Sequence, residues 1–233
     1  QTCALPIYPT RGFSKVMSMV QELMPRLYES IVKLHEPGQT AIIAATLAFP
    51  ARIAQDKLHI PVVTIHLQPT CFRSVYQAPI VPGTYMPDGA PRWFKSAQWW
   101  LADQFIDYVI GRPINQMRRS LNLPPVRRVM REWIHSPLLT LGLFPEWFCA
   151  PQPDWPSQIK LTGFPLYDER GVTTMPATLE QFLSQGEAPI VFTPGSAMVH
   201  GRSFFDAAVD ACVRINRRGV LLSRFAQNIP PGL

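Results

Sequence analysis

Two apolar runs of strand length flank a short helical segment between residues 40 and 67. The first run covers residues 40–49 and the second, which is rich in Val and Ile, covers residues 61–67; residues 51–58 have helical spacing. Neither run alternates apolar with polar residues, as a strand with one solvated face does. This order predicts an α/β protein whose parallel sheet is covered by helices on both faces.

More helices and another strand are expected on either side of this unit. Apolar residues recur at helical spacing over residues 13–34, where Pro25 is expected to kink or interrupt the helix. A basic helix is expected around residues 127–133, followed by a strand at residues 138–144. The sheet therefore has at least three predicted strands.

A long loop rich in Pro and Gly follows the second strand, over residues 68–92. Loops of this length in compact domains are mostly functional or disordered. His66 and Gln68 lie where the strand ends and the loop begins. Because ligands of parallel sheets bind beyond the carboxyl ends of the strands, this edge is one candidate site.

Large aromatic residues form a helical stripe after the loop. Such stripes normally bury a large apolar area, so packing explains the Trp residues more simply than a pocket wall does. The stripe consists of Trp93, Phe94, Ala97, Trp100, Leu101, Phe105, Tyr108 and Val109, with Trp99 beside it.

Residues 188–198 read as an apolar strand that runs into a Pro-Gly-Ser turn. The N–H groups and dipole of a following helix attract anions, Gly195 lets the backbone approach a ligand, and Ser196 can donate a hydrogen bond. The turn therefore predicts a pyrophosphate site, with helix packing alone as the alternative. The helix is expected from Ser203, with one side formed by Phe204, Ala207, Ala208, Ala211 and Cys212.

Composition restricts the class of protein. The chain has 233 residues, of which 47% are hydrophobic and 16% charged, as expected for one large or two smaller globular domains. No run reaches the ~18 apolar residues of a transmembrane helix. The four Cys are far apart and no His or Cys pair has metal-ligand spacing, so we expect neither a disulfide framework nor a metal site.

The remaining basic residues have simple explanations. His35, His59 and His135 are expected at the surface or in caps, whereas the role of His66 is left open. A solvated basic face is expected from Arg118, Arg119, Arg127, Arg128 and Arg131; with a net charge of +6, the alternative is that it attracts anionic membrane lipids. A nucleic-acid role is not expected, because these residues are not interleaved with exposed aromatic residues on a known module.

Five segments share a pattern with one family of enzymes. They are residues 11–13 (RGF), 62–70 (VVTIHLQPT), 144–156 (FPEWFCAPQPDWP), 161–169 (LTGFPLYDE) and 192–197 (FTPGSA). Together they resemble bacterial glycosyltransferases with two Rossmann-like domains, related to UDP-glucuronosyltransferases, sterol glucosyltransferases and the rhamnosyltransferase of rhamnolipid synthesis. The resemblance runs from about Tyr8 to the end of the chain.

The resemblance implies an α/β GT-B fold with two Rossmann-like parallel-sheet domains, both incomplete here. Residues 8–148 then form the second half of the N-terminal acceptor domain, residues 149–170 the interdomain linker, and residues 171–233 the start of the C-terminal nucleotide-sugar-binding domain. Residues 1–7 match a translated sequencing adapter and are interpreted as an artefact. The chain is therefore expected to be an inactive fragment of an active enzyme.

The resemblance also implies which residues bind substrates. Gly195, Ser196 and Ala197 match the turn that meets the donor diphosphate, and Ser223 and Arg224 follow the second strand of the donor domain. The acceptor pocket is expected around Thr46, His66, Gln68 and Thr70. No cofactor is expected.

The catalytic residues stay unassigned at this point. The base of the family is a His in a Gly-rich turn near the N-terminus, and that segment has no counterpart here. The Asp that orients this base is expected near Thr46, which cannot stabilise an imidazolium as a carboxylate does. A base in the family deprotonates the acceptor hydroxyl, which then attacks the anomeric carbon with inversion.

The expected function is therefore nucleotide-sugar-dependent transfer of a sugar to a hydroxyl of a lipid or other hydrophobic small molecule. The protein is expected in the cytoplasm, with peripheral contact at the inner membrane face. One alternative is a non-catalytic relative that binds nucleotide sugar or lipid. A serine hydrolase that uses Ser196 is poorly supported, because the turn lacks the G-x-S-x-G elbow.

Overall fold

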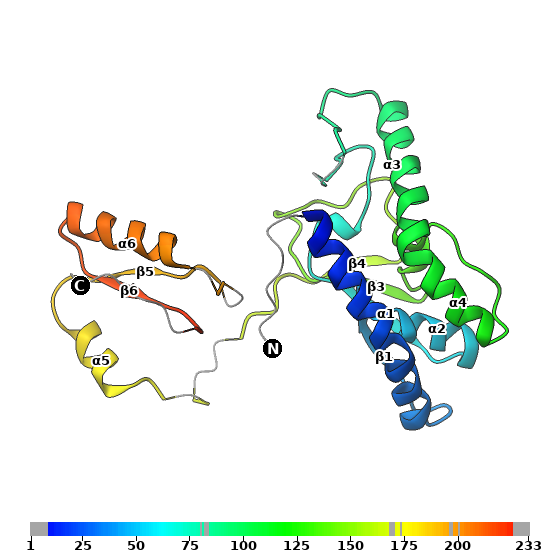
Figure 1. Ribbon diagram of the computed structural model, residues 1–233, viewed down its shortest axis with the longest axis horizontal. Helices are drawn as coiled ribbons and strands as arrows, with labels where there is room; N and C mark the ends of the chain where they lie inside the picture. The colour runs from blue at the N-terminus through cyan, green and yellow to red at the C-terminus, as the bar shows by residue number, and fades with distance from the viewer. Residues whose placement is uncertain are drawn as a thin grey trace. The chain divides into compact units, whose positions relative to one another are not determined.

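The computed structural model describes residues 9–79, 81, 84–167, 171–172, 174–195, 198–199 and 201–225. The chain forms two compact units, the first ending at Leu166 and the second covering Tyr167–Leu233 (Figure 1). Residues 1–7, interpreted above as an artefact, lie outside the described residues.

The first unit is built on a parallel sheet with the strand order β1-β2-β3-β4. Ile42 pairs with Val62 and Val63 with Leu139, so the carboxyl ends of β1, β2 and β3 meet at one edge. The predicted α/β class with parallel strands is confirmed. The strands are β1 (Ile42–Ala45), β2 (Val62–His66), β3 (Leu139–Gly142) and β4 (Ile159–Leu161).

Three helices share the main apolar core of this unit: α1 (Pro9–Leu34), α2 (Phe49–Leu58) and α4 (Arg112–Ser120). Pro25 lies inside α1 without interrupting it, because Met24 and Tyr28 on either side are anchored in the core. The other buried members of this core are Phe49, Ile53, Ala54, Ile60, Ile110, Ile114, Val129, Trp133 and Ile134.

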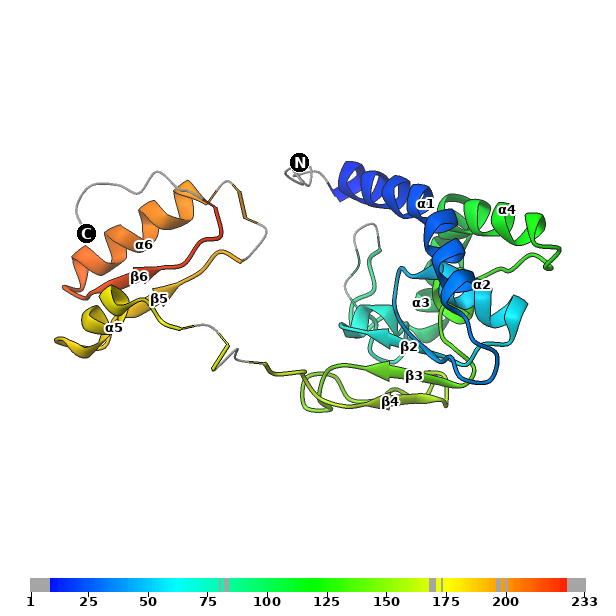
Figure 2. The same cartoon turned by 90° about the horizontal axis from the view of Figure 1, so that it is seen from below.

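Only one face of the sheet is fully buried, whereas the sequence predicts two covered faces. Ala44, Val62 and Thr64 are buried on the helix side. On the other face Ile43 is 72% exposed and Val63 is half-buried. The reason is that α1 and α2 contribute to the same core, and Figure 2 shows α1, α2 and α4 on one side of β3 and β4.

A long helical rod follows the loop. It consists of α3 (Arg92–Ile106), the π-helical turn η2 (Asp107–Gly111) and α4, one after another (Figure 1). A second π-helical turn, η3 (Val129–Trp133), lies where the basic helix is predicted. The short helix η1 (Pro69–Cys71) lies at the start of the loop.

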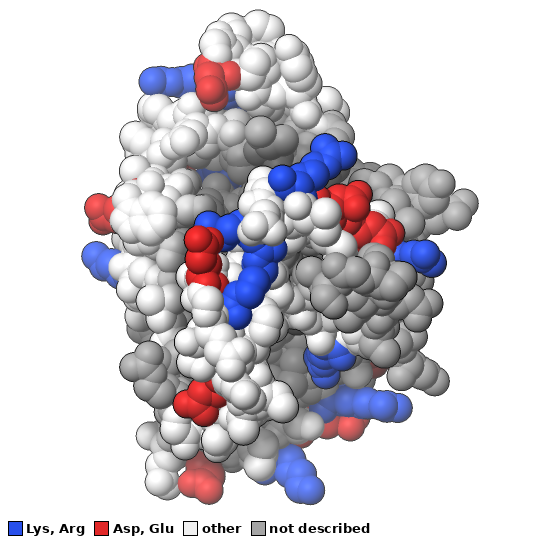
Figure 3. All heavy atoms as spheres, turned by 90° about the vertical axis from the view of Figure 1, so that its left-hand side faces the viewer, with Lys and Arg blue, Asp and Glu red and all other residues white. Residues whose placement is uncertain are grey.

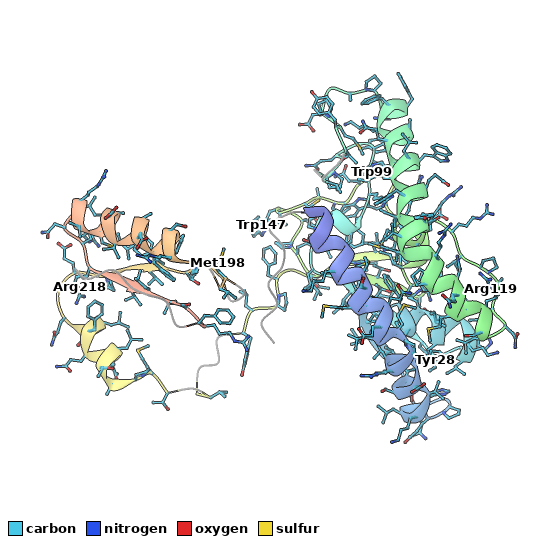
Figure 4. The ribbon with its side chains drawn as sticks, viewed as in Figure 1. Tyr28, Trp99, Arg119, Trp147, Met198 and Arg218 are labelled. Atoms are coloured by element: carbon cyan, nitrogen blue, oxygen red, sulfur yellow. The ribbon has the colours of Figure 1, made fainter. Side chains whose placement is uncertain are left out.

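The loop packs against one side of α3. Trp99 Nε1 donates to the carbonyl of Ser74 at 3.1 Å, and Lys95 Nζ donates to the carbonyls of Asp88 at 3.3 Å and Tyr76 at 3.5 Å. Trp99 is labelled on this side of α3 in Figure 4. The loop therefore holds α3 through a tryptophan and a lysine that are both almost completely buried.

The predicted burial of the α3 tryptophans is confirmed for Trp99 and wrong for Trp93 and Trp100. Trp93 and Trp100 are exposed, and the buried side of the helix carries Lys95, Trp99 and Asp103. The spacing of apolar residues predicts that the most hydrophobic side of α3 is the buried one. Here the polar side is buried instead, because loop carbonyls bind Lys95 and the guanidinium of Arg73 binds Asp103.

The second unit contains a parallel strand pair. Ile190 lies opposite Gly219 and Phe192 opposite Leu221. Arg218 directly precedes the last strand of this unit, and its guanidinium donates to the carbonyls of Phe182, in the first helix of the unit, and of Glu187 (Figure 4). The elements are α5 (Ala177–Ser184), β5 (Ile190–Phe192), α6 (Arg202–Arg214) and β6 (Gly219–Leu221).

The buried side of α6 differs from the predicted side. Of the five predicted residues only Ala208 and Cys212 are buried, and Phe205 and Val209 complete the buried side. The helix α6 approaches β6 closely at Cys212. A Cβ added to Gly219 would lie 3.0 Å from the Sγ of Cys212, so a side chain at position 219 would force the two elements apart.

Candidate functional site

The carboxyl edge of the first sheet brings Thr46 and His66 together. Thr46 directly follows β1, and His66 is the last residue of the neighbouring strand β2. The hydroxyl of Thr46 lies 2.8 Å from Nδ1 of His66. Two residues 20 positions apart, both predicted near the acceptor, are therefore joined by a hydrogen bond.

A second histidine extends this hydrogen-bonded chain. Nδ1 of His135 lies 3.1 Å from Nε2 of His66. His135 is 4% exposed and His66 is 0% exposed. The expectation that His135 is a surface or capping residue is wrong, because the segment after η3 returns along β2 and carries this ring into the interior.

Aromatic rings close the other sides of the histidine pair. The ring of Phe72 stacks on His135 at a centroid distance of 5.5 Å and meets the edge of His66 at 5.0 Å. Phe72 also contacts Phe144 and Trp155. The two imidazoles therefore lie in an apolar enclosure, in which the half-buried Thr46 is the neighbour nearer to solvent.

This enclosure keeps both imidazoles neutral at pH 7. Burial lowers the pKa of His66 to about 4. Burial also lowers the pKa of His135 to about 3, with smaller contributions from His66, Arg52 and Arg73. A neutral imidazole has one N–H donor and one acceptor nitrogen. In the chain of Thr46, His66 and His135, the ring of His66 therefore donates through one nitrogen and accepts through the other, and Nδ1 of His135 takes the complementary role.

The other two predicted acceptor residues lie on the loop after β2. Gln68 and Thr70 are both exposed at η1. Cys71 in the same short helix is buried, and its Sγ lies 3.8 Å from the hydroxyl of Thr46. The structure thus joins Thr46 to His66 by a hydrogen bond, whereas the side chains of Gln68 and Thr70 are exposed to solvent.

The second unit forms the predicted strand–turn–helix corner. Gly195 follows β5 with a φ of +95°, a conformation that an L residue rarely adopts, and its N–H donates to the hydroxyl of Thr193 at 3.4 Å. Ser223 and Arg224 follow the paired strand β6 and are exposed. Since β5 and β6 are parallel neighbours, these residues lie at the same edge. Ser196 and Ala197 lie outside the described residues.

Comparison with solved structures shows the fold. The glycotransferase of kitacinnamycin matches 100% of this chain with a TM-score of 0.53 and 15% identity, and the chain covers 54% of that protein. CalG4, the calicheamicin glycosyltransferase, matches 97% of the chain with a TM-score of 0.51 and 12% identity, with 51% of that protein covered. This is the GT-B fold of glycosyltransferases.

One curated protein is similar in sequence. The O-mycaminosyltylonolide 6-deoxyallosyltransferase of Streptomyces fradiae is 34% identical over 127 residues, which is 51% of this chain and 28% of that protein. No protein-family model matches the chain. The chain thus spans about half the length of the GT-B structures and less of the deoxyallosyltransferase.

The described residues include no group of three or more His, Cys, Asp or Glu that could hold a metal ion. Over the same part of the chain, no helix is long and apolar enough to span a membrane.

The predicted basic face needs one correction. Arg118 is 3% exposed, and its guanidinium binds Asp56 and the carbonyl of Pro124. It also lies over the ring of Trp133, so it is a packing residue. Arg119, at the end of α4, is exposed as expected (Figure 4).

Sequence reasoning missed the buried polar groups around the site. His135 gave no signal, because no motif distinguishes a histidine in a loop from one in the interior. The Arg73–Asp103 ion pair joins residues 30 positions apart and also has no local pattern. The face drawn in Figure 3 carries blue and red side chains separated by white areas.

Proposed function

We propose that the complete protein is an inverting glycosyltransferase of hexosyltransferase type. It transfers a sugar from a nucleotide-sugar donor to a hydroxyl of a lipid or other hydrophobic small molecule. One observation carries the proposal: the 34% identity over 127 residues to a protein named as a deoxyallosyltransferase. The name of that relative, whose acceptor is O-mycaminosyltylonolide, supports a hydrophobic macrolide-type acceptor.

The donor binds at the corner of the second unit. In this proposal Gly195, Ser196 and Ala197 bind the donor diphosphate, and Ser223 and Arg224 contact the nucleotide from the end of the neighbouring strand; Ser196 and Ala197 lie outside the described residues. The exposed position and positive φ of Gly195 support this role. Amide donors and a helix dipole stabilise the charge that develops on the departing diphosphate, and this proposal requires no metal.

The acceptor binds at the carboxyl edge of the first sheet. Thr46 offers a hydroxyl there, and His66, backed by His135, holds that hydroxyl in one orientation. Gln68 and Thr70 extend the pocket along the loop. His66 is too buried and too weakly basic to deprotonate the acceptor, so the catalytic base is a different group.

The proposal places the protein in the cytoplasm, with peripheral contact at the inner membrane face. Such contact brings an apolar acceptor within reach of the first unit. The proposal is tested on the complete protein with a panel of nucleotide sugars, by thermal shift and by chromatography of the products. One donor is expected to raise the melting temperature and to yield a glycosylated acceptor. Stabilisation by none of the donors contradicts the proposal.

Replacing Gly195 with Ala is expected to weaken binding of the nucleotide sugar about tenfold. The added Cβ has no atom within 4 Å, so the loss comes from the φ of +95° and from the closer contact with the ligand. Gly171, also in the second unit, has a φ of +85° and equally open surroundings, so Gly171→Ala is the matched control. If Gly195→Ala and Gly171→Ala lost affinity for the nucleotide sugar equally, the donor would not bind at Gly195.

Replacing Thr46 with Val is expected to raise KM for the acceptor about tenfold, the effect of one lost hydrogen bond. Val keeps the shape of Thr but cannot bind His66 or the acceptor. Thr46→Ser retains the hydroxyl and is expected to restore most of the affinity. An unchanged KM in Thr46→Val, measured in initial-rate assays, removes Thr46 from the acceptor site.

A second candidate function is a non-catalytic relative that binds nucleotide sugar or lipid. Thr46 favours it, because a hydroxyl already engaged by His66 stands where the family has an Asp. Donor binding without product formation in the complete protein would support this candidate over the transferase.

A further inference from the structure

One face of α3 exposes large apolar side chains to solvent. Monomeric proteins rarely leave so much contiguous apolar surface uncovered, and such patches mark sites of interaction. The residues lie at positions 93, 100, 101, 105 and 108 of α3 and the first turn of η2, which at 100° per residue places them on one side of the helical rod over about 22 Å. This α3 face consists of Trp93 (71% exposed), Trp100 (59%), Leu101 (60%), Phe105 (61%) and Tyr108 (58%).

The α3 face is not needed to hold the helix in place. The opposite side does this through Trp99 and Lys95, which bind loop carbonyls, and through Asp103, which binds Arg73. Residues of the α3 face can therefore be changed without removing these contacts.

The α3 face lies in the most basic part of the chain. Residues 92–134, all of them described, contain eight Arg or Lys and three Asp or Glu, a net charge of +5 out of +6 for the whole chain. The three carboxylates are all engaged. Asp103 binds Arg73, Asp107 accepts from the backbone N–H groups after Arg127, and Glu132 binds Arg128. The exposed arginines are Arg92, Arg112, Arg119, Arg127, Arg128 and Arg131.

An arginine stands at one end of the apolar side chains. The guanidinium of Arg112 lies 3.8 Å from the ring centroid of Tyr108, whereas that of Arg92 lies over Tyr76 of the loop, which packs on the other side of α3. Trp and Tyr at a water–lipid boundary, with arginines that reach phosphate groups, are typical of helices that lie in the plane of a membrane surface. A protein partner or a nucleic acid does not require this combination.

We propose that the α3 face docks on an anionic lipid bilayer. Trp100, Leu101 and Phe105 enter the boundary between head groups and acyl chains, while Arg112 binds a lipid phosphate. The contact is peripheral, since one face of one helix is inserted. This proposal rests on the peripheral membrane contact included in the proposed function and names the surface that makes it. Because no sugar or nucleotide takes part, vesicle binding and donor binding are measured separately.

The test measures binding of the full chain to sedimented vesicles. Vesicles of phosphatidylcholine that contain phosphatidylglycerol are expected to bind the chain at least about tenfold more tightly than pure phosphatidylcholine, and added salt is expected to reduce binding. Leu101→Ser with Phe105→Ser is expected to lower the partition coefficient about tenfold or more. The matched control is Met19→Ser with Leu23→Ser, which removes exposed apolar side chains from α1.

A second measurement does not depend on substitutions of apolar residues. Brominated anionic lipids are expected to quench the fluorescence of Trp93 and Trp100, and Trp93→Phe with Trp100→Phe is expected to abolish the quenching. The proposal is overturned if the chain does not bind anionic vesicles. It is also overturned if the partition coefficient falls equally in the α3 and α1 variants. It is also overturned if the α3 variant instead abolishes self-association in sedimentation, binding to RNA, or acceptor affinity while vesicle binding stays unchanged.

Discussion

Replacing Asp103 with Ala is expected to lower the free energy of unfolding of the first unit by about 3–5 kcal/mol. The side chain of Asp103 is 4% exposed and that of its partner Arg73 is 9% exposed. The substitution leaves the Arg73 guanidinium buried against the ring of Trp99 without a counter-charge. Burial already raises the pKa of Asp103 and lowers that of Arg73, so both ions have lost most of their hydration.

Urea unfolding followed by tryptophan fluorescence measures this loss. All six tryptophans lie in the first unit, so the signal reports that unit alone. The double variant Arg73→Met with Asp103→Leu is expected to recover most of the stability, because it removes both charges. Glu132→Gln breaks an exposed pair with Arg128 and is expected to cost less than about 1 kcal/mol. If Asp103→Ala lowered the free energy of unfolding no more than Glu132→Gln does, the Asp103–Arg73 pair would not be a buried ion pair.

Lowering the pH from 7 to 5 is expected to destabilise the first unit by about 4 kcal/mol through His66 and His135 together. Their pKa values in the folded chain are about 4 and about 3, below the value of about 6.5 in an unfolded chain. The unfolded state therefore binds protons first as the pH falls. Their contribution to stability is fully present above about pH 6.5 and is lost progressively as the pH falls towards the folded pKa values.

Urea unfolding at several pH values between 4 and 7.5, by the same fluorescence signal, checks this. His135→Gln removes one of the two buried imidazoles and is expected to halve the pH dependence, even if the variant is less stable at pH 7. His59→Asn changes an exposed histidine whose φ of 57° suits Asn, and is expected to leave the slope unchanged. An unchanged slope in His135→Gln would show that the pair does not control the acid response.

The strands were predictable because their apolar runs are local. The pattern at residues 40–67 indicates strand, helix and strand, and these are β1, α2 and β2 in the structure. The parallel pairing follows, since a helix between two strands returns the chain to the same end of the sheet. The coverage of the second face was not predictable, because it depends on where α1 packs.

The site was predicted in part. Thr46 and His66 were expected at one edge because both follow parallel strands, and a hydrogen bond joins them. The contribution of His135 could not be predicted, since it reaches the pair across 69 positions of sequence. The sequence also assigned Arg118 to a solvated face, whereas Asp56, 62 positions away, binds it in the interior.

Local pattern determined the strands, the helices, their parallel order and the glycine turn after β5, because each depends on residues within a few positions of one another. The tertiary structure decided which side of each helix is buried, which histidines are neutral and which arginines are paired. These properties depend on burial and on partners far apart in the chain. On α3 the side that packs against the loop carries Lys95, Trp99 and Asp103, whereas Trp93, Trp100 and Phe105 are exposed. The spacing of apolar residues in the sequence does not predict this difference.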